Sequence, residues 1–182
     1  MAGEYEKAIS VKEAIDAINN RYFLLPSIQR KFVWNSHQIC VLFDSIMRGY
    51  PINTFMLWEV KNAPIKKDYK FYEFLKEYCQ RFNEENPVVK TNSSFHDFSA
   101  VIDGQQRLTS LYIGLCSTYA YKQPRVWWPN TRDDTILPPR KLYLDLCQPA
   151  NNGEDESLMY YNFKFLTEKQ YEVSSNGEEQ QY

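Results

Sequence analysis

The stretch Ala100-Val101-Ile102-Asp103-Gly104-Gln105-Gln106-Arg107-Leu108-Thr109 changes from an apolar run to a polar turn and then to a helical pattern. Residues 98–102 form a short apolar run, typical of a buried strand that ends at Asp103. From Gly104 to about Tyr121, large apolar residues recur at helical spacing, namely Leu108, Leu111, Tyr112 and Leu115. The sequence therefore predicts a strand, a tight polar turn and a helix in direct succession.

The residues of this turn suit an anionic ligand. Backbone N–H groups in the first turn of a helix have no intrahelical partner, and the helix dipole favours negative charge there. Gly104 allows close approach to the backbone, and Arg107 offers a planar fork that matches phosphate oxygens. Gln105 and Gln106 donate or accept hydrogen bonds without adding charge, while Asp103 is suited to cap the helix or to hold a divalent cation.

A purely structural interpretation of the same turn is also available. In it, Asp103 caps the helix, Gln106 completes a capping box and Arg107 is an ordinary solvated helix residue. Spacing alone does not separate this interpretation from a phosphate site.

The segments on either side predict an α+β (mixed α/β) domain. Helices are expected within residues 8–20, capped by Ser10, and from Asn35 to Gly49, with Asn35 and Gln38 as a capping-box pair. The remaining expected elements are strands at 23–25, 54–60, 141–146 and 161–166, a helix at 71–82, and loops at 83–97 and 122–140. We expect one domain over residues 8–170 and a polar, frayed tail at 171–182 that leads into a longer chain.

The composition excludes several classes of protein. With 43% hydrophobic residues the chain is not disordered, and a net charge of −2 gives no basic excess of the kind that marks a generic nucleic-acid binder. The four widely spaced cysteines form no zinc pattern and are expected to be buried thiols in a reducing compartment. No apolar run is long enough to span a membrane and the N-terminal residues lack the basic-then-apolar pattern of a signal peptide, so we expect a cytoplasmic protein without a membrane partner.

Two further segments have both a functional and a structural interpretation. Residues 25–34 place Gln29, Arg30 and Lys31 between apolar flanks, which is either a phosphate-binding turn or a plain polar loop. In residues 44–52, Asp44 and Arg48 lie four residues apart on one helix face, where an ordinary surface ion pair is the simplest reading.

Taken together, the three segments resemble a known family. Pro26-x-x-Gln29-Arg30-x-Phe32-Val33-Trp34, Asp44-Ser45-Ile46-x-Arg48-Gly49-Tyr50-Pro51-Ile52 and Ile102–Leu111 occur in this order. In this arrangement the sequence resembles the N-terminal domain of GmrSD-type restriction proteins, catalogued as domain of unknown function family 262. The resemblance implies a ParB/sulfiredoxin-like fold and Mg²⁺-dependent hydrolysis of nucleoside triphosphates in proteins that restrict modified foreign DNA in phage defence.

The resemblance also assigns roles by position. The expected catalytic residues are Asp103, Gln105, Gln106 and Arg107; the expected nucleotide- or phosphate-binding residues are Gln29, Arg30, Gly104, Arg107 and Thr109; and Mg²⁺ would be held by Asp103. No His-Asn-His nuclease pattern occurs in the 182 residues, so the nuclease is expected in a C-terminal domain or a separate subunit. Two alternatives stay open: a nucleotide sensor without turnover, and a DNA-binding module that uses Lys66, Lys67, Arg125 and Arg132.

Overall fold

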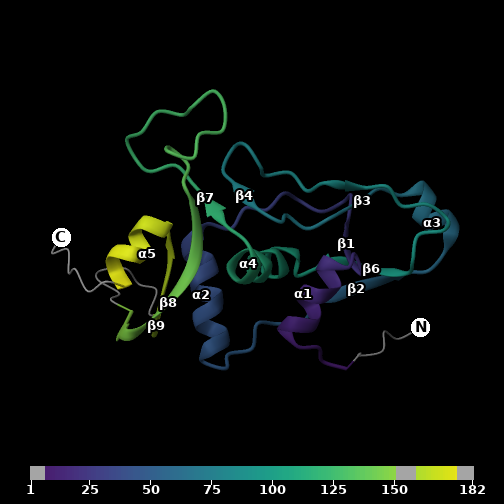
Figure 1. Ribbon diagram of the computed structural model, residues 1–182. Helices are drawn as coiled ribbons and strands as arrows, with labels where there is room; N and C mark the ends of the chain where they lie inside the picture. Colours follow the sequence, from purple (N-terminus) through teal and green to yellow (C-terminus); the bar gives the residue numbers. More distant parts are fainter. Residues whose placement is uncertain (1–6, 151–158, 176–182) are drawn as a thin grey trace. The chain divides into compact units, whose positions relative to one another are not determined.

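The computed structural model describes residues 7–150 and 159–175, which form two compact units (Figure 1). The first unit comprises residues up to 29, 55–74 and 86–108, and the second comprises 30–54, 75–85 and 109 onward. Each unit contains its own sheet with helices beside it, which confirms the predicted α+β class.

The first unit contains a five-stranded sheet in the order β2-β6-β1-β3-β5. Its core is formed by large apolar residues from these strands, with Leu24, Val60, Phe71 and Phe98 almost fully buried. The elements of this unit are α1 (Val11–Asn19), β1 (Phe23–Pro26), β2 (Met56–Val60), α3 (Ala63–Asp68), β3 (Phe71–Tyr72), β5 (Val88–Val89) and β6 (Phe98–Asp103).

Within this sheet, β1 and β6 are parallel neighbours, with Phe23 opposite Ser99 and Leu24 opposite Ala100. The other pairings of the sheet, β2 with β6, β1 with β3 and β3 with β5, are antiparallel. Adjacent parallel strands end at the same edge of a sheet. The segments that follow β1 and β6 therefore lie side by side.

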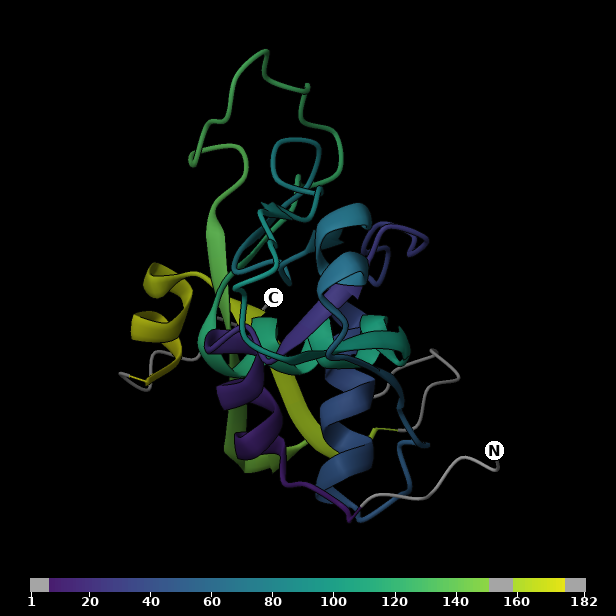
Figure 2. The same cartoon turned by 90° about the vertical axis from the view of Figure 1, so that its right-hand side faces the viewer.

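The second unit contains a four-stranded sheet in the order β4-β7-β8-β9. Helix α2 lies along β9 in Figure 2, and the Phe43 and Phe163 rings meet there with their centroids 5.7 Å apart. The elements of this unit are α2 (Ser36–Met47), β4 (Tyr78–Cys79), β7 (Tyr119–Ala120), β8 (Pro139–Pro149), β9 (Tyr161–Leu166) and α5 (Glu168–Ser175). Helix α4 (Gln105–Cys116) begins in the first unit and continues in the second from Thr109.

The two predicted helix starts are confirmed. Ser10 caps α1 in a complete capping box with Glu13, and Asn35 caps α2 in one with Gln38. The strands at 23–25, 54–60, 98–102, 141–146 and 161–166 are also present, each within a few residues of the predicted bounds.

The predicted helix over residues 71–82 is wrong. Phe71 and Tyr72 form β3, which pairs with β1 and β5, and Tyr78 and Cys79 form β4. The aromatic spacing is helical, but Phe71 is buried in the first unit and Tyr78 in the second. The regular spacing therefore reflects burial in two separate cores and not one helix face. Phe and Tyr also favour strands.

Helix α4 ends at Cys116, five residues before the predicted end at Tyr121. Tyr119 and Ala120 leave the helix because they pair with Arg140 and Pro139 of β8. Leu115 was expected on the core face but is exposed, because it lies in the last turn of the helix.

The expectation of four buried thiols is half wrong. Cys40 and Cys79 are buried, whereas Cys116 and Cys147 are exposed. Burial raises the pKa of the Cys40 thiol to about 12, so that this thiol is unreactive at neutral pH.

The other differences from the sequence prediction concern short or terminal elements. The structure has α3 where the sequence predicted no element and β5 within the expected loop at 83–97, and α5 extends into the expected tail as far as Ser175. The rest of that tail, 176–182, lies outside the described residues. No helix in the described ranges is long and apolar enough to cross a bilayer.

Candidate functional site

The turn between β6 and α4 has a glycine at the helix N-cap. The Gly104 carbonyl accepts the Leu108 N–H at 3.0 Å, and Gly104 has a φ of +93°, which a residue with a side chain rarely adopts. Because the cap is a glycine, it supplies no capping side chain. Gln106 is then the second helical residue, so the predicted capping box of Asp103 and Gln106 is wrong.

Gly104 lies directly against the ring of Phe55. A Cβ atom on Gly104 would lie 2.2 Å from Phe55 Cδ1 and 3.2 Å from Arg107 Nη2. Both the backbone conformation and the available space therefore require glycine at this position.

Asp103 and Arg107 form an ion pair across the turn. Arg107 Nη2 lies 3.2 Å from Asp103 Oδ2, and the guanidinium carbon lies 4.8 Å from the centroid of the Phe55 ring. The Arg107 side chain is only 15% exposed, whereas that of Asp103 is 70% exposed. The Arg107 guanidinium is thus fixed by Asp103 and Phe55 and is not the solvated helix residue of the structural interpretation. The Asp103 carboxylate is accessible to a ligand.

The two glutamines of the turn are both buried. Thr109, one helical turn further along α4, is buried as well, and its hydroxyl has no hydrogen-bond partner within the described ranges. The catalytic roles expected for Gln105 and Gln106, and the binding role expected for Thr109, stay predictions.

Gln29 lies beside the turn, as the parallel pairing of β1 and β6 requires. Its amide Nε2 donates to the Ile102 carbonyl at 2.8 Å, one residue before Asp103. The structure thus brings Gln29 to the β6 end. Arg30 is exposed and is assigned to the second unit, and its expected binding role stays a prediction.

Asp44 is not part of an ordinary surface pair, contrary to the simplest reading of the sequence. It is buried, and its Oδ1 accepts the backbone N–H groups of Tyr160 and Tyr161, both at 2.8 Å. Arg48 Nη1 lies 3.3 Å from its Oδ2. Asp44 therefore ties α2 to the start of β9 and has a structural role.

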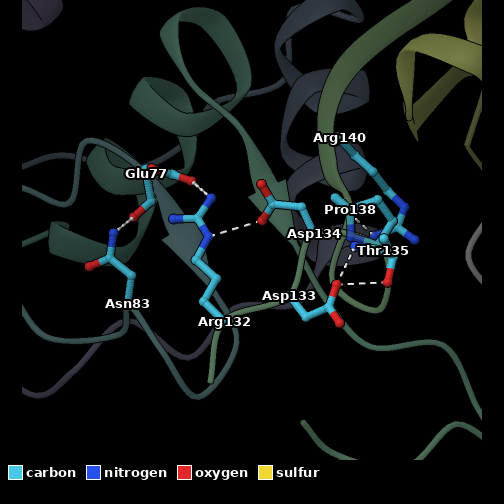
Figure 3. Close-up of polar contacts among 8 residues, drawn as sticks. All are labelled: Glu77, Asn83, Arg132, Asp133, Asp134, Thr135, Pro138 and Arg140. Carbon is cyan, nitrogen blue, oxygen red and sulfur yellow. Dashed lines mark hydrogen bonds and ion pairs between the residues drawn. The ribbon is translucent and has the colours of Figure 1, made fainter. Parts of the chain in front are cut away.

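Two of the four cations proposed for DNA binding are already engaged. Lys66 is buried and its ammonium lies 2.6 Å from Asp97 Oδ1. Arg132 points between two carboxylates (Figure 3), 2.5 Å from Glu77 and 3.1 Å from Asp134. Hydrogen bonds to Glu77 and then Asp134 raise the pKa of Arg132. Lys66 and Arg132 would have to give up these partners to contact phosphate, and their roles in DNA binding stay predictions.

The donor set at the turn suits Mg²⁺ shared with a ligand. Among the residues that the structure describes, no three His, Cys, Asp or Glu side chains gather into a metal-binding group. Mg²⁺ bound with nucleotides commonly uses one or two protein carboxylates and completes its octahedron with phosphate oxygens and water. The exposed carboxylate of Asp103 fits that mode.

Phe55 belongs to the candidate site although the sequence did not identify it. The residue supports both Gly104 and the Arg107 guanidinium. Its place in an apolar stretch predicts a strand and says nothing of this contact, because the pairing of β2 with β6 that brings it there is long-range.

Two comparisons show which known proteins this chain is similar to. A family model described as the GmrSD restriction endonuclease, N-terminal domain, matches residues 11–182, a range that includes all three quoted segments. The uncharacterized protein MJ0686 of Methanocaldococcus jannaschii is 28% identical over 158 residues, which cover 84% of this chain. The match covers 23% of that relative, so the chain spans less than a quarter of its length.

Proposed function

The chain belongs to the family of GmrSD restriction endonuclease N-terminal domains, and from that premise we propose that it binds and hydrolyses a nucleoside triphosphate at the turn between β6 and α4. The observation that carries the proposal is the Asp103–Gly104–Arg107 arrangement. There, an exposed carboxylate and a held guanidinium lie at the glycine-capped start of a helix. A triphosphate needs a cation and a carboxylate for Mg²⁺ at one place, and this turn supplies both.

Each residue of the turn would contribute by position and charge. Arg107 faces the phosphates with its guanidinium plane fixed by Phe55, so that little side-chain freedom is lost on binding. Mg²⁺, when bound, would neutralise charge on the phosphates. Asp103 would hold the metal or orient the attacking water.

Binding of a triphosphate would change the Asp103–Arg107 pair. At 3.2 Å with Asp103 70% exposed, the pair is a solvated one of low strength. The anionic ligand would compete with Asp103 for Arg107, and the Asp103 carboxylate would then be available to hold Mg²⁺. Gln29, which is bonded to the Ile102 carbonyl, holds the end of β6 in place during this exchange.

In the full protein, turnover at this turn would act on a nuclease in a C-terminal domain or a separate subunit. A nucleotide sensor without turnover would use the same contacts but would release no phosphate.

The test measures phosphate release from each common nucleoside triphosphate with and without Mg²⁺. Wild-type protein is expected to release phosphate only with Mg²⁺, and Arg107→Ala and Asp103→Asn are each expected to lower the rate at least tenfold. Arg21→Ala serves as the matched control, because Arg21 is also a paired arginine of the first unit, 2.7 Å from Glu73. A folded Arg107→Ala protein with the wild-type rate would refute the proposal, and tight binding without phosphate release would identify a sensor.

A further inference from the structure

The loop between β7 and β8 carries an exposed tryptophan among cations. Trp127 is 91% exposed, which is exceptional for the largest apolar side chain. Trp128, 38% exposed, has Lys122 Nζ 5.4 Å and the Arg81 guanidinium 5.6 Å from its ring centroid. Arg125, two residues before Trp127, is exposed as well.

The charge of the segment between Asp103 and Asp133 is one-sided, although the chain as a whole is weakly acidic and Glu84 lies beside Arg81. No Asp or Glu occurs between Asp103 and Asp133, and the loop contributes Lys122, Arg125 and Arg132. Of these, Arg132 is neutralised by Glu77 and Asp134. The cations near the tryptophans, Lys122, Arg125 and Arg81, therefore give this surface a positive potential that whole-chain charge conceals.

The base of the loop is fixed. The buried Arg140 donates from Nη1 to the carbonyls of Tyr121 and Pro138, both at 3.1 Å, and so joins the two ends of the loop (Figure 3 shows the Pro138 contact). Arg132 anchors the middle of the loop to Glu77. The tryptophans are thus presented on a supported loop.

Backbone strain is located at the same place. Arg81 and Arg125 both have positive φ values, of 72° and 66°, a conformation that costs a residue with a side chain. The Arg81 turn is held by Glu84, whose Oε1 accepts the Arg81 N–H at 2.8 Å.

We propose that this surface, made by Arg81, Lys122, Arg125, Trp127 and Trp128, binds a single strand of nucleic acid, with one base stacked on Trp127 and the adjacent phosphates on the three cations. An unstacked base has a flat face that matches the exposed indole, and stacking of this kind tolerates any base. A duplex keeps its base faces covered, and an acidic polypeptide satisfies the cations but leaves the indole without a flat partner. The proposal does not depend on the nucleotide site, which lies in the first unit.

The test measures fluorescence anisotropy of a labelled single-stranded oligothymidine, titrated with the 182-residue chain in the absence of nucleotide. Stacking of one base contributes about 5- to 150-fold in affinity, so Trp127→Ala is expected to weaken binding by that factor and Trp127→Phe by less. Arg125→Gln is expected to lower the dependence of log affinity on log salt by about 0.7, the value for one phosphate of a single strand.

Two matched controls separate this effect from general loss of apolar or basic surface. Leu146→Ala removes an apolar side chain that is 88% exposed, and Lys169→Gln removes an exposed cation; both are expected to bind like the wild type. Trp127 is so exposed that its variants are expected to keep the wild-type circular dichroism. The proposal is overturned if the wild type does not retain the strand, or if Trp127→Ala binds it equally well. It is also overturned if a duplex of the same length or polyglutamate binds as tightly with the same dependence on Trp127.

Discussion

Substitution of Gly104 by alanine tests the geometry on which the proposed site depends. The new Cβ would be strained by the φ of +93° and would lie 2.2 Å from Phe55 Cδ1. The left-handed backbone costs about 1–2 kcal/mol, and displacement of a packed ring costs about 1–3 kcal/mol. We therefore expect Gly104→Ala to lower the free energy of unfolding by about 2–5 kcal/mol.

The chain offers a matched control for the backbone part of this cost. Gly49 also has a positive φ, +73°, but nothing lies within 4 Å of its added Cβ. Gly49→Ala should thus lose only about 1–2 kcal/mol. In a Phe55→Ala background, the extra cost of Gly104→Ala should disappear.

Urea unfolding followed by circular dichroism measures all four variants, and similar slopes with denaturant show that the same surface is exposed in each. The reasoning is refuted if Gly104→Ala costs no more than Gly49→Ala. It is also refuted if removal of the Phe55 ring leaves the cost of Gly104→Ala unchanged.

Three further predictions concern stability and thiol chemistry. Asp44→Ala leaves the Tyr160 and Tyr161 N–H groups without their acceptor, so urea unfolding should show a free energy of unfolding lower by about 3–5 kcal/mol. Asp44→Asn keeps an oxygen at this position and should lose clearly less stability. Equal losses in the two variants would contradict the assigned role. Ellman's reagent at pH 8 should modify the exposed thiols of Cys116 and Cys147 rapidly. The buried thiols of Cys40 and Cys79 should react only on unfolding, because burial raises the pKa of both. Equal rates of modification for all four thiols would contradict this prediction. Burial first, and then Glu84, raises the pKa of Tyr78 from 10.0 to about 12. The contribution of the neutral Tyr78 hydroxyl to the free energy of unfolding is therefore complete below pH 10 and is lost as the pH rises to 12. The free energy of unfolding of Tyr78→Phe should fall less over that interval, and an identical fall would refute the assignment.

Local sequence patterns predicted those parts of the fold that local chemistry decides. The capping boxes at Ser10 and Asn35 and the change from apolar strand to helix around Asp103 each depend on neighbouring residues, and all three are present in the structure. The prediction of a helix over residues 71–82 was wrong because the aromatic residues of this segment belong to two different cores. Which core a residue enters depends on contacts distant in sequence.

The candidate site was predictable in composition but not in geometry. The motif identified Asp103, Gly104 and Arg107, whereas the support from Phe55 and the bond from Gln29 to Ile102 depend on strand pairing that no local pattern encodes. The burial of Asp44 and Lys66 was not predicted for the same reason. Charged residues are expected to be exposed unless their partners in the folded chain are known.

A thermal-shift titration with nucleoside triphosphates in the presence and absence of Mg²⁺ tests the central claim most directly. A ligand that binds only the folded state raises the apparent stability. At least one triphosphate with Mg²⁺ is therefore expected to raise the melting temperature of the wild type and of Arg21→Ala but not of Arg107→Ala. The claim is contradicted if no triphosphate raises the melting temperature of the wild type, or if Arg107→Ala shows the same increase.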